Sequence, residues 1–213
     1  MPELALFSRG RRFVRALLVL AMVLLPQAAL ADGAQDAMSF VHGLAERAIT
    51  TVADKSLADS ERADRFRRLF VASFDMPEIG RFALARYWRS TSPEQQQQFL
   101  SLFEDIAVLT WAQRFKEYNG ETLDALAAMP DGERGWVVDS RILRKQGPPI
   151  AVQWRLRRGE DERFRVVDIV VESVSMAITH RSDYGAALQS NGGKMDGLFA
   201  TMRAKIEQLK AAG

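Results

Sequence analysis

Apolar residues recur at helical spacing along two stretches of the chain, and between these stretches they alternate with polar residues. Positions three and four apart share one face of a helix, so this spacing predicts amphipathic helices that each bury one side. Local signals mark two helix starts. Asp59 is a candidate N-cap, and SPEQ at residues 92–95 combines a Ser N-cap, Pro at the first helical position and Gln at the third. The predicted helices cover residues 36–54, 59–74, 75–88, 93–118, 181–190 and 195–209.

Between the two helical stretches the apolar period changes from 3.6 to 2, which is typical of antiparallel strands with one face covered and one face wet. This pattern predicts three strands over residues 136–143, 150–157 and 164–174. The third is apolar on both faces over residues 166–171, which favours a central position in the sheet. Residues 121–126 are a candidate for a further strand, although the alanines after them favour a helix. Helices, a strand meander and helices again predict one α+β domain.

The first 31 residues have the three parts of a secretory signal peptide. Four arginines, ending at Arg15, form a basic segment, residues 16–25 are continuously apolar, and Ala29-Leu30-Ala31 places small residues at the −3 and −1 positions. We therefore expect export by the general secretory route, cleavage after Ala31 and a single mature domain over residues 32–213. The apolar run is about half of the roughly 20 residues that span a bilayer. An uncleaved N-terminal anchor is the alternative.

Export changes the meaning of the overall charge. The whole chain has 29 Lys+Arg and 27 Asp+Glu, a formal charge of +2. The presequence carries four arginines and one acid, Glu3, which leaves 25 basic and 26 acidic residues and a mature charge near −1. A nucleic-acid partner therefore has no overall electrostatic support. The absence of Cys from all 213 residues excludes disulfides, thiolate metal sites and a cysteine nucleophile.

Residues that carry polar chemistry are sparse. The chain has two histidines, His42 and His180, and it has no His-Glu-x-x-His motif, phosphate-binding loop or Gly-x-Ser-x-Gly motif. We therefore predict no metal site, no cofactor and no catalytic residue. His180 and Asp183 are the nearest approach to a catalytic pair, but triad members come from separate segments, so closeness in sequence is weak support. The 12 Phe, 8 Met and 4 Trp residues either fill a core or line an apolar cavity.

Two segments of the chain carry distinctive short motifs. The first consists of FDMPEIGRF at residues 74–82, YWR at 87–89 and SPEQ at 92–95. The second consists of DIVVESVSM at residues 168–176 and RSDY at 181–184. These motifs resemble signatures of the MlaC/toluene-tolerance family. The order of these segments matches the family, and they extend over most of the mature chain. One departure is Ser173, where the family usually has Gly.

The resemblance implies a periplasmic lipid carrier. Family members hold phospholipid acyl chains in a deep apolar pocket between a curved antiparallel sheet, here of about four strands, and surrounding helices, in a cystatin-like or nuclear-transport-factor-like α+β fold. The implied partners are an outer-membrane lipoprotein complex and an inner-membrane ABC transporter with a substrate-binding ring, and the implied role is intermembrane lipid transport that maintains outer-membrane lipid asymmetry. The HpnM branch, which is associated with hopanoids, remains an alternative.

Candidate lipid-binding residues are those on apolar faces that would meet across such a pocket. They are Phe70, Phe74, Ile79, Phe82, Phe103, Ile106, Phe115, Val138, Ile142, Val152, Trp154, Leu156, Val167, Ile169 and Val171. The last three represent one of two possible faces of the third strand. Two other classes of function stay open: an exported enzyme that uses His180 and Asp183, and a chaperone-like periplasmic module that binds proteins through exposed strand edges.

Arginines gather on or near the predicted strand surfaces. They form either a solvated face, balanced by the acids of residues 160–162, or a docking surface for anionic lipid or an acidic protein. These arginines are Arg141, Arg155, Arg157, Arg163 and Arg165.

Overall fold

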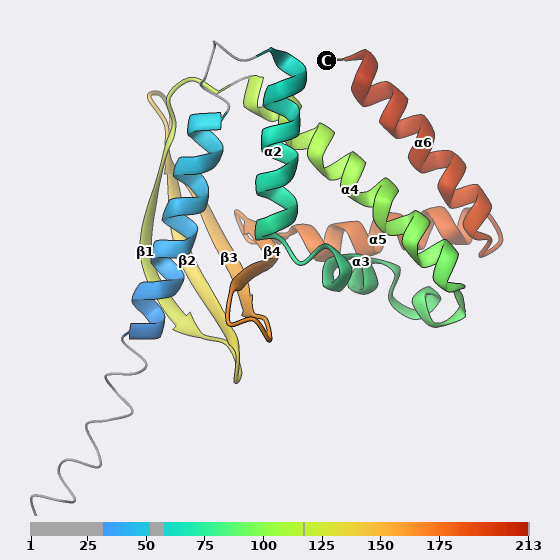
Figure 1. Ribbon diagram of the computed structural model, residues 1–213, viewed down its shortest axis with the longest axis horizontal. Coiled ribbons are helices and arrows are strands. Elements are labelled where there is room, and N and C mark those ends of the chain that lie inside the picture. Colours follow the sequence, from blue (N-terminus) through green and yellow to red (C-terminus); the bar gives the residue numbers. More distant parts are fainter. Residues whose placement is uncertain (1–31, 52–57, 117, 213) are drawn as a thin grey trace, which may run out of the picture.

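The computed structural model describes residues 32–51, 58–116 and 118–212, and the predicted signal peptide lies outside these residues. Within the described ranges, no helix is both long and apolar enough to cross a bilayer. A first helix over residues 32–51 is followed by α2 (Asp59–Ser73), α3 (Met76–Leu84), η1 (Ala85–Ser90), α4 (Pro93–Lys116), β1 (Thr122–Pro130), β2 (Gly135–Leu143), β3 (Ile150–Arg158), β4 (Phe164–Val171), β5 (Val174–Ser175), α5 (Met176–Ser190) and α6 (Met195–Ala211), as Figure 1 shows.

Helix boundaries follow the sequence where the capping signal is local. The Ser92 hydroxyl accepts a hydrogen bond from the Gln95 backbone N–H at 3.3 Å, and the Gln95 side chain accepts one from the Ser92 N–H at 3.2 Å. This reciprocal pair confirms the predicted capping box. Asp75 caps α3 by accepting from the Glu78 N–H at 3.0 Å. The continuous helix predicted to residue 88 is wrong, because Ala85 has a φ of 49° and separates α3 from the 3-10 helix η1.

The end of β4 also differs from the prediction. The third predicted strand ran to residue 174, whereas β4 ends at Val171. Glu172 and Ser173 then turn the chain with φ values of 47° and 71°, and α5 begins at Met176 instead of at residue 181.

The early start of α5 depends on a side chain in the sheet. Ser175 is the N-cap and accepts a hydrogen bond from the Ile178 N–H at 3.1 Å. Asp168 of β4 accepts from the Ala177 N–H at 2.9 Å and from the Ser175 hydroxyl at 2.6 Å. A carboxylate beside the first turn is also favourable for the helix dipole. This start therefore results from a contact between the helix and the strand.

The five strands form one antiparallel sheet in the order β1-β2-β3-β4-β5. The candidate strand at residues 121–126 is present as β1, which begins at Thr122 and continues to Pro130. Four long strands and the two-residue β5 agree with the predicted curved sheet of about four strands. β4 lies one place from the edge, where β5 pairs with its last two residues, Val170 and Val171, and Phe74 bridges to Val166 in its first half.

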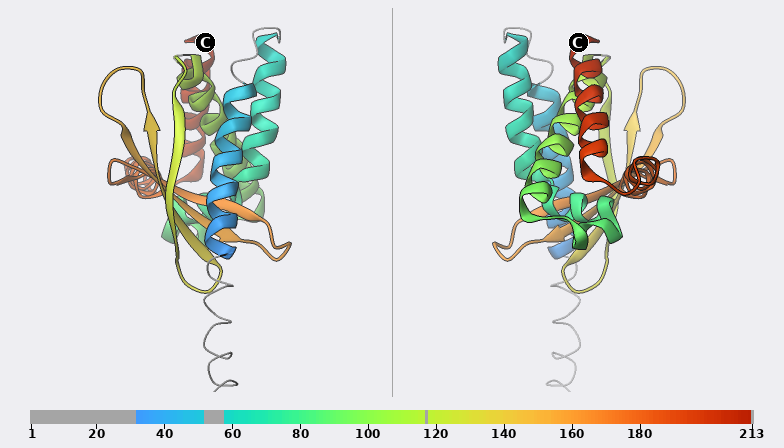
Figure 2. Two further views of the ribbon diagram at one scale, coloured as in Figure 1. Left: turned by 90° about the vertical axis from the view of Figure 1, so that its left-hand side faces the viewer. Right: turned by 90° about the vertical axis from the view of Figure 1, so that its right-hand side faces the viewer.

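One face of the sheet is apolar and lies under the first helix (Figures 1 and 2). Val138, Val152 and Leu156 point to this face and form a buried cluster with Ala37 and Val41 of the helix. The cluster, here named the sheet core, also contains Leu44, Phe164, Val166 and Ile169. Burial of these side chains is worth roughly 1.5–3 kcal/mol for each large residue, which fixes the first helix on the sheet.

A second buried cluster lies among the helices on the far side of α2 (Figure 1). This helical core is built from the apolar stripes of α2, α3, α4, α5 and α6, and Phe99 and Leu198 are fully buried in it. Phe74 and Trp111 are half-buried and pack against both clusters. The fold therefore has two apolar cores that meet along one seam, marked by these two aromatic residues.

Candidate functional site

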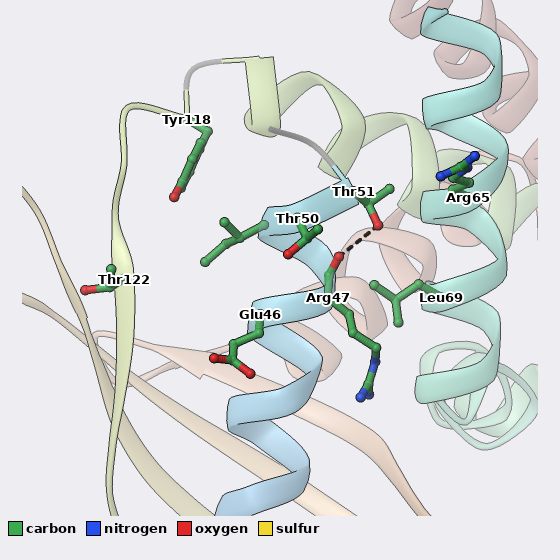
Figure 3. A pocket seen from close by; sticks show the side chains of 9 residues that line it. Glu46, Arg47, Thr50, Thr51, Arg65, Leu69, Tyr118 and Thr122 are labelled. Atoms are coloured by element: carbon green, nitrogen blue, oxygen red, sulfur yellow. Dashed lines mark hydrogen bonds between the residues drawn. The ribbon is translucent and has the colours of Figure 1, made fainter. Parts of the chain in front are cut away.

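A cleft of about 870 Å³ opens where the first helix, α2 and β1 approach one another. Its volume lies within the range of roughly 300–1,000 Å³ that is usual for ligand pockets. Figure 3 shows the residues that line it. They are Glu46, Arg47, Ile49, Thr50 and Thr51 of the first helix, Arg65 and Leu69 of α2, Tyr118 of the following loop and Thr122 of β1.

Leu69 connects this cleft to the interior of the protein. Its side chain points from α2 toward the first helix (Figure 3) and also packs against the sheet core. Leu69 therefore lies between the polar rim of the cleft and the sheet core, and the sheet core in turn meets the helical core at Phe74 and Trp111.

The rim of the cleft is charged. The Arg65 Nε donates to the Glu61 carboxylate at 2.8 Å, and this hydrogen bond holds the pKa of Glu61 below its ordinary value. Glu46 lies 3.2 Å from His42 on the same helix. Arg47 forms no ion pair with any residue that the structure describes. The rim can therefore contact a polar or anionic group while the interior accepts an apolar one.

His180, the candidate for enzyme chemistry, packs against aromatic side chains. Its ring meets Phe103 edge-on at a centroid distance of 5.3 Å and stacks on Tyr184 at 6.1 Å. Burial lowers the pKa of His180, and this effect exceeds the opposing charges of Asp183 and Asp168. Burial also raises the pKa of Tyr184. His180 does not line the cleft, and the described residues hold no cluster of three or more His, Cys, Asp or Glu side chains that could bind a metal ion.

The structure divides the predicted lipid-binding residues between the two cores. The helical core contains or packs against Phe70, Phe74, Ile79, Phe103 and Ile106, and the sheet core contains or packs against Phe74, Val138, Ile142, Val152, Trp154, Leu156, Ile169 and Val171. The predicted faces were expected to meet across one pocket, whereas the structure packs them into two cores that share Phe74. None of these side chains lines the open cleft itself.

Two members of the predicted set join neither core, and the side chain of a third is not among those that the structure describes. Phe82 is 40% exposed on α3, where the Arg181 guanidinium covers its ring at 5.3 Å, so it does not face either core. Val167 is the extra residue at a register shift between β3 and β4 and joins neither core, so the prediction that it shares a face with Ile169 and Val171 is wrong. The backbone of Phe115 is in α4, and its side chain lies outside the described part of the chain.

The residues that line the cleft were missed as a site by sequence reasoning. Ile49 and Leu69 belong to apolar helical stripes, and Tyr118 ends the helix predicted over residues 93–118, but a stripe by itself does not distinguish a cleft wall from a filled core. Arg47 and Arg65 carry no motif. The signal that identifies these residues is tertiary: they come from three separate segments that meet at one opening.

Four of the five arginines predicted on or near the strand surfaces are paired with acids; the fifth, Arg163, has no ion pair among the described residues. Arg141 lies 2.8 Å from Asp124, and Arg165 lies 2.7 Å from Asp161, which lowers the pKa of Asp161 to about 2. Arg157 lies 3.4 Å from Glu78 of α3, and Arg155 lies 3.9 Å from Asp168. This pairing is typical of a solvated face with balanced charge.

The amino-acid sequence of this chain is similar to a known protein family and to two curated relatives. The family described as MlaC protein matches residues 43–204. The toluene tolerance protein ttg2D of Pseudomonas putida is 23% identical over 127 residues, and the intermembrane phospholipid transport system binding protein MlaC of Haemophilus influenzae is 24% identical over 132 residues. These matches cover 60% and 61% of this chain and 59% and 61% of the relatives, so the chain spans about three fifths of each relative's length.

A solved structure has the same fold. The phospholipid-binding protein from Ralstonia solanacearum, determined in complex with a phospholipid, superposes with a TM-score of 0.72 at 22% sequence identity. The match covers 82% of this chain and 99% of that one.

Proposed function

Because this chain belongs to the MlaC family, we propose that it is a periplasmic phospholipid carrier that holds acyl chains in its apolar interior and moves lipid between the outer and inner membranes. The observation that carries the proposal is the cleft, whose wall residue Leu69 also packs against the sheet core. The phospholipid in the Ralstonia solanacearum structure and the name of the Haemophilus influenzae relative support the ligand class.

The energetics of a free lipid explain why such a carrier needs an interior cavity. Transfer of one methylene out of water is worth about 0.8 kcal/mol, so an acyl chain of about sixteen carbons exposes roughly 12 kcal/mol of unfavourable hydration. A carrier must cover most of that surface. The polar headgroup is stable in water and can remain at the rim of the cleft.

We infer that the acyl chains enter between the first helix and α2. The side chain of Leu69 forms the inner part of this entrance, and Phe74 and Trp111 lie where the sheet core and the helical core meet. The predicted lipid-binding residues of the sheet core would then lie on one side of the acyl chains, and those of the helical core on the other side. This arrangement requires α2 and the first helix to separate as the chains enter, since the cores are packed in the structure described here.

The proposed carrier needs partners at both membranes, because a passive carrier only equilibrates its cargo. We propose an outer-membrane lipoprotein complex as one partner and an inner-membrane ABC transporter with a substrate-binding ring as the other. The proposed work needs no cofactor and no catalytic residue. Periplasmic localisation follows from the predicted signal peptide with cleavage after Ala31.

Native mass spectrometry of the mature protein, isolated from bacterial periplasm, tests the ligand directly. We expect one phospholipid per protein molecule, and fluorescent phospholipid should pass between donor and acceptor vesicles faster when the protein is present. A bound hopanoid would identify the HpnM type of carrier instead. Protein that is folded, carries no extractable lipid and takes up none from vesicles would contradict the proposal.

A further inference from the structure

Positive charge is concentrated on one side of the cleft, where the first helix faces α2. Arg47 and Arg65 both line this side, and Leu69 lies between them in Figure 3. Arg68 follows on α2, 3.9 Å from Glu61. The single carboxylate of Glu61 thus serves two arginines, because Arg65 also binds it at 2.8 Å. Together with Arg47, this surface has an excess of positive charge.

Arg47 occupies a position that suits an anionic ligand. Its side chain extends into the groove between the first helix and α2 (Figure 3). Gly43, one turn earlier on the helix, leaves room for this conformation, because a Cβ there would lie 3.3 Å from the Arg47 Nη1. In the described part of the chain Arg47 has no carboxylate partner. A guanidinium beside an apolar entrance, with no counterion among the residues that the structure describes, is available for a phosphate.

Arg65 provides a second charge with free donors. Its hydrogen bond to Glu61 uses Nε, and within the described ranges neither of its Nη groups has a partner. The acid on the cleft wall, Glu46, extends toward the β1 side in Figure 3 and is paired with His42. The two sides of the cleft therefore differ in charge, and an anion is favoured on the α2 side.

We propose that Arg47, assisted by Arg65, binds the phosphodiester of the lipid headgroup while the acyl chains pass Leu69 into the interior. This inference rests on the proposed function and adds a recognition residue to it. Since all phospholipids share the phosphodiester, the contact selects phospholipids over neutral lipids with the same chains and does not select among headgroups. A guanidinium and a phosphate form charge-assisted hydrogen bonds, which are stronger than neutral ones.

The test compares two lipids with identical chains, dioleoyl phosphatidylglycerol and dioleoylglycerol, which lacks the phosphate. Lipid-free protein is incubated with vesicles that contain both, and the bound lipids are quantified by mass spectrometry. Because the site is exposed, we expect wild-type protein to prefer the phosphatidylglycerol about fivefold, about 1 kcal/mol. Arg47→Gln should bind the two lipids about equally, and Arg65→Gln should show a smaller loss. The matched control is Arg203→Gln, on the exposed face of α6 away from the cleft, which should keep the wild-type preference.

Salt provides a second measurement. The preference of wild-type protein should decrease when ionic strength rises from about 0.05 to 1 M, because the Debye length shortens to roughly 3 Å.

Equal binding of both lipids by wild-type protein, or an unchanged preference in Arg47→Gln, would overturn the inference and leave the carrier function standing. Failure to bind either lipid would instead refute the carrier function. If inorganic phosphate stabilises lipid-free wild-type protein but not Arg47→Gln, and no lipid preference exists, the site binds free phosphate and the assignment to a headgroup is wrong.

Discussion

Leu69→Asp places a carboxylate at the point where the cleft meets the sheet core. An acyl chain in this entrance would have to leave about three methylenes hydrated beside the charge, at about 0.8 kcal/mol each. The expected loss of lipid affinity is therefore about 2.5 kcal/mol, or roughly sixtyfold. Leu69 is only partly buried, so the free energy of unfolding should fall by about 1–2 kcal/mol and the protein should remain folded.

The matched variant is Leu69→Met, which keeps the volume and apolar character of the side chain and should cost less than about 1.5 kcal/mol of stability. Both proteins are purified from periplasm, their phospholipid content is measured by native mass spectrometry, and their folding is checked by urea unfolding. Leu69→Asp should contain little lipid and Leu69→Met should contain a wild-type amount. A folded Leu69→Asp protein with a full complement of phospholipid would refute the reasoning that chains enter past this residue.

Three further predictions concern the scaffold. Ser173→Gly should raise the free energy of unfolding by about 1 kcal/mol in urea titrations, because Ser173 has a φ of 71° that strains a residue with a Cβ. Ser140→Ala should lower it by about 1–2 kcal/mol, since the buried hydroxyl accepts from the Trp154 Nε1 at 3.0 Å and donates to the Val152 carbonyl at 2.8 Å; an unchanged midpoint would contradict this. Burial lowers the pKa of His180 below 6.5, so the folded protein binds fewer protons than the unfolded chain and loses stability as pH falls below about 6.5. His180→Phe should therefore lose less stability than wild type between about pH 7 and pH 5, and equal losses would show that His180 does not carry this dependence.

Helices with local signals could be predicted well from the sequence. The start of α4 follows from SPEQ at residues 92–95, whose side chains and backbone groups complete one another within four residues. The start of α5 could not be found this way. It depends partly on Asp168, which belongs to β4, seven residues before the N-cap Ser175, and contacts the helix because the chain turns back between them so that β4 lies beside the first turn. Contacts of this kind leave no periodic pattern.

The candidate site, like the helices, has features that could be predicted from the sequence and others that depend on tertiary contacts. Apolar stripes correctly identified most residues that are buried, among them Phe103 and Val152. They did not show that these two residues belong to different cores, because a stripe specifies which side is buried and not what covers it. The alternation along β4 also misled the prediction, since the register shift at Val167 changes which residues share a face.

By itself, the sequence determined the class of the fold, the approximate positions of its helices and strands, and the family to which it belongs, because these depend on periodicity, capping groups and short signatures that are local in the chain. The tertiary structure alone decided where the protein is open. The cleft is formed by residues of the first helix, α2, the loop at Tyr118 and the start of β1, whereas the ion pairs at its rim, Arg65 with Glu61 and His42 with Glu46, each lie within one helix. Long-range packing brings the separate segments together, and no single segment encodes the opening.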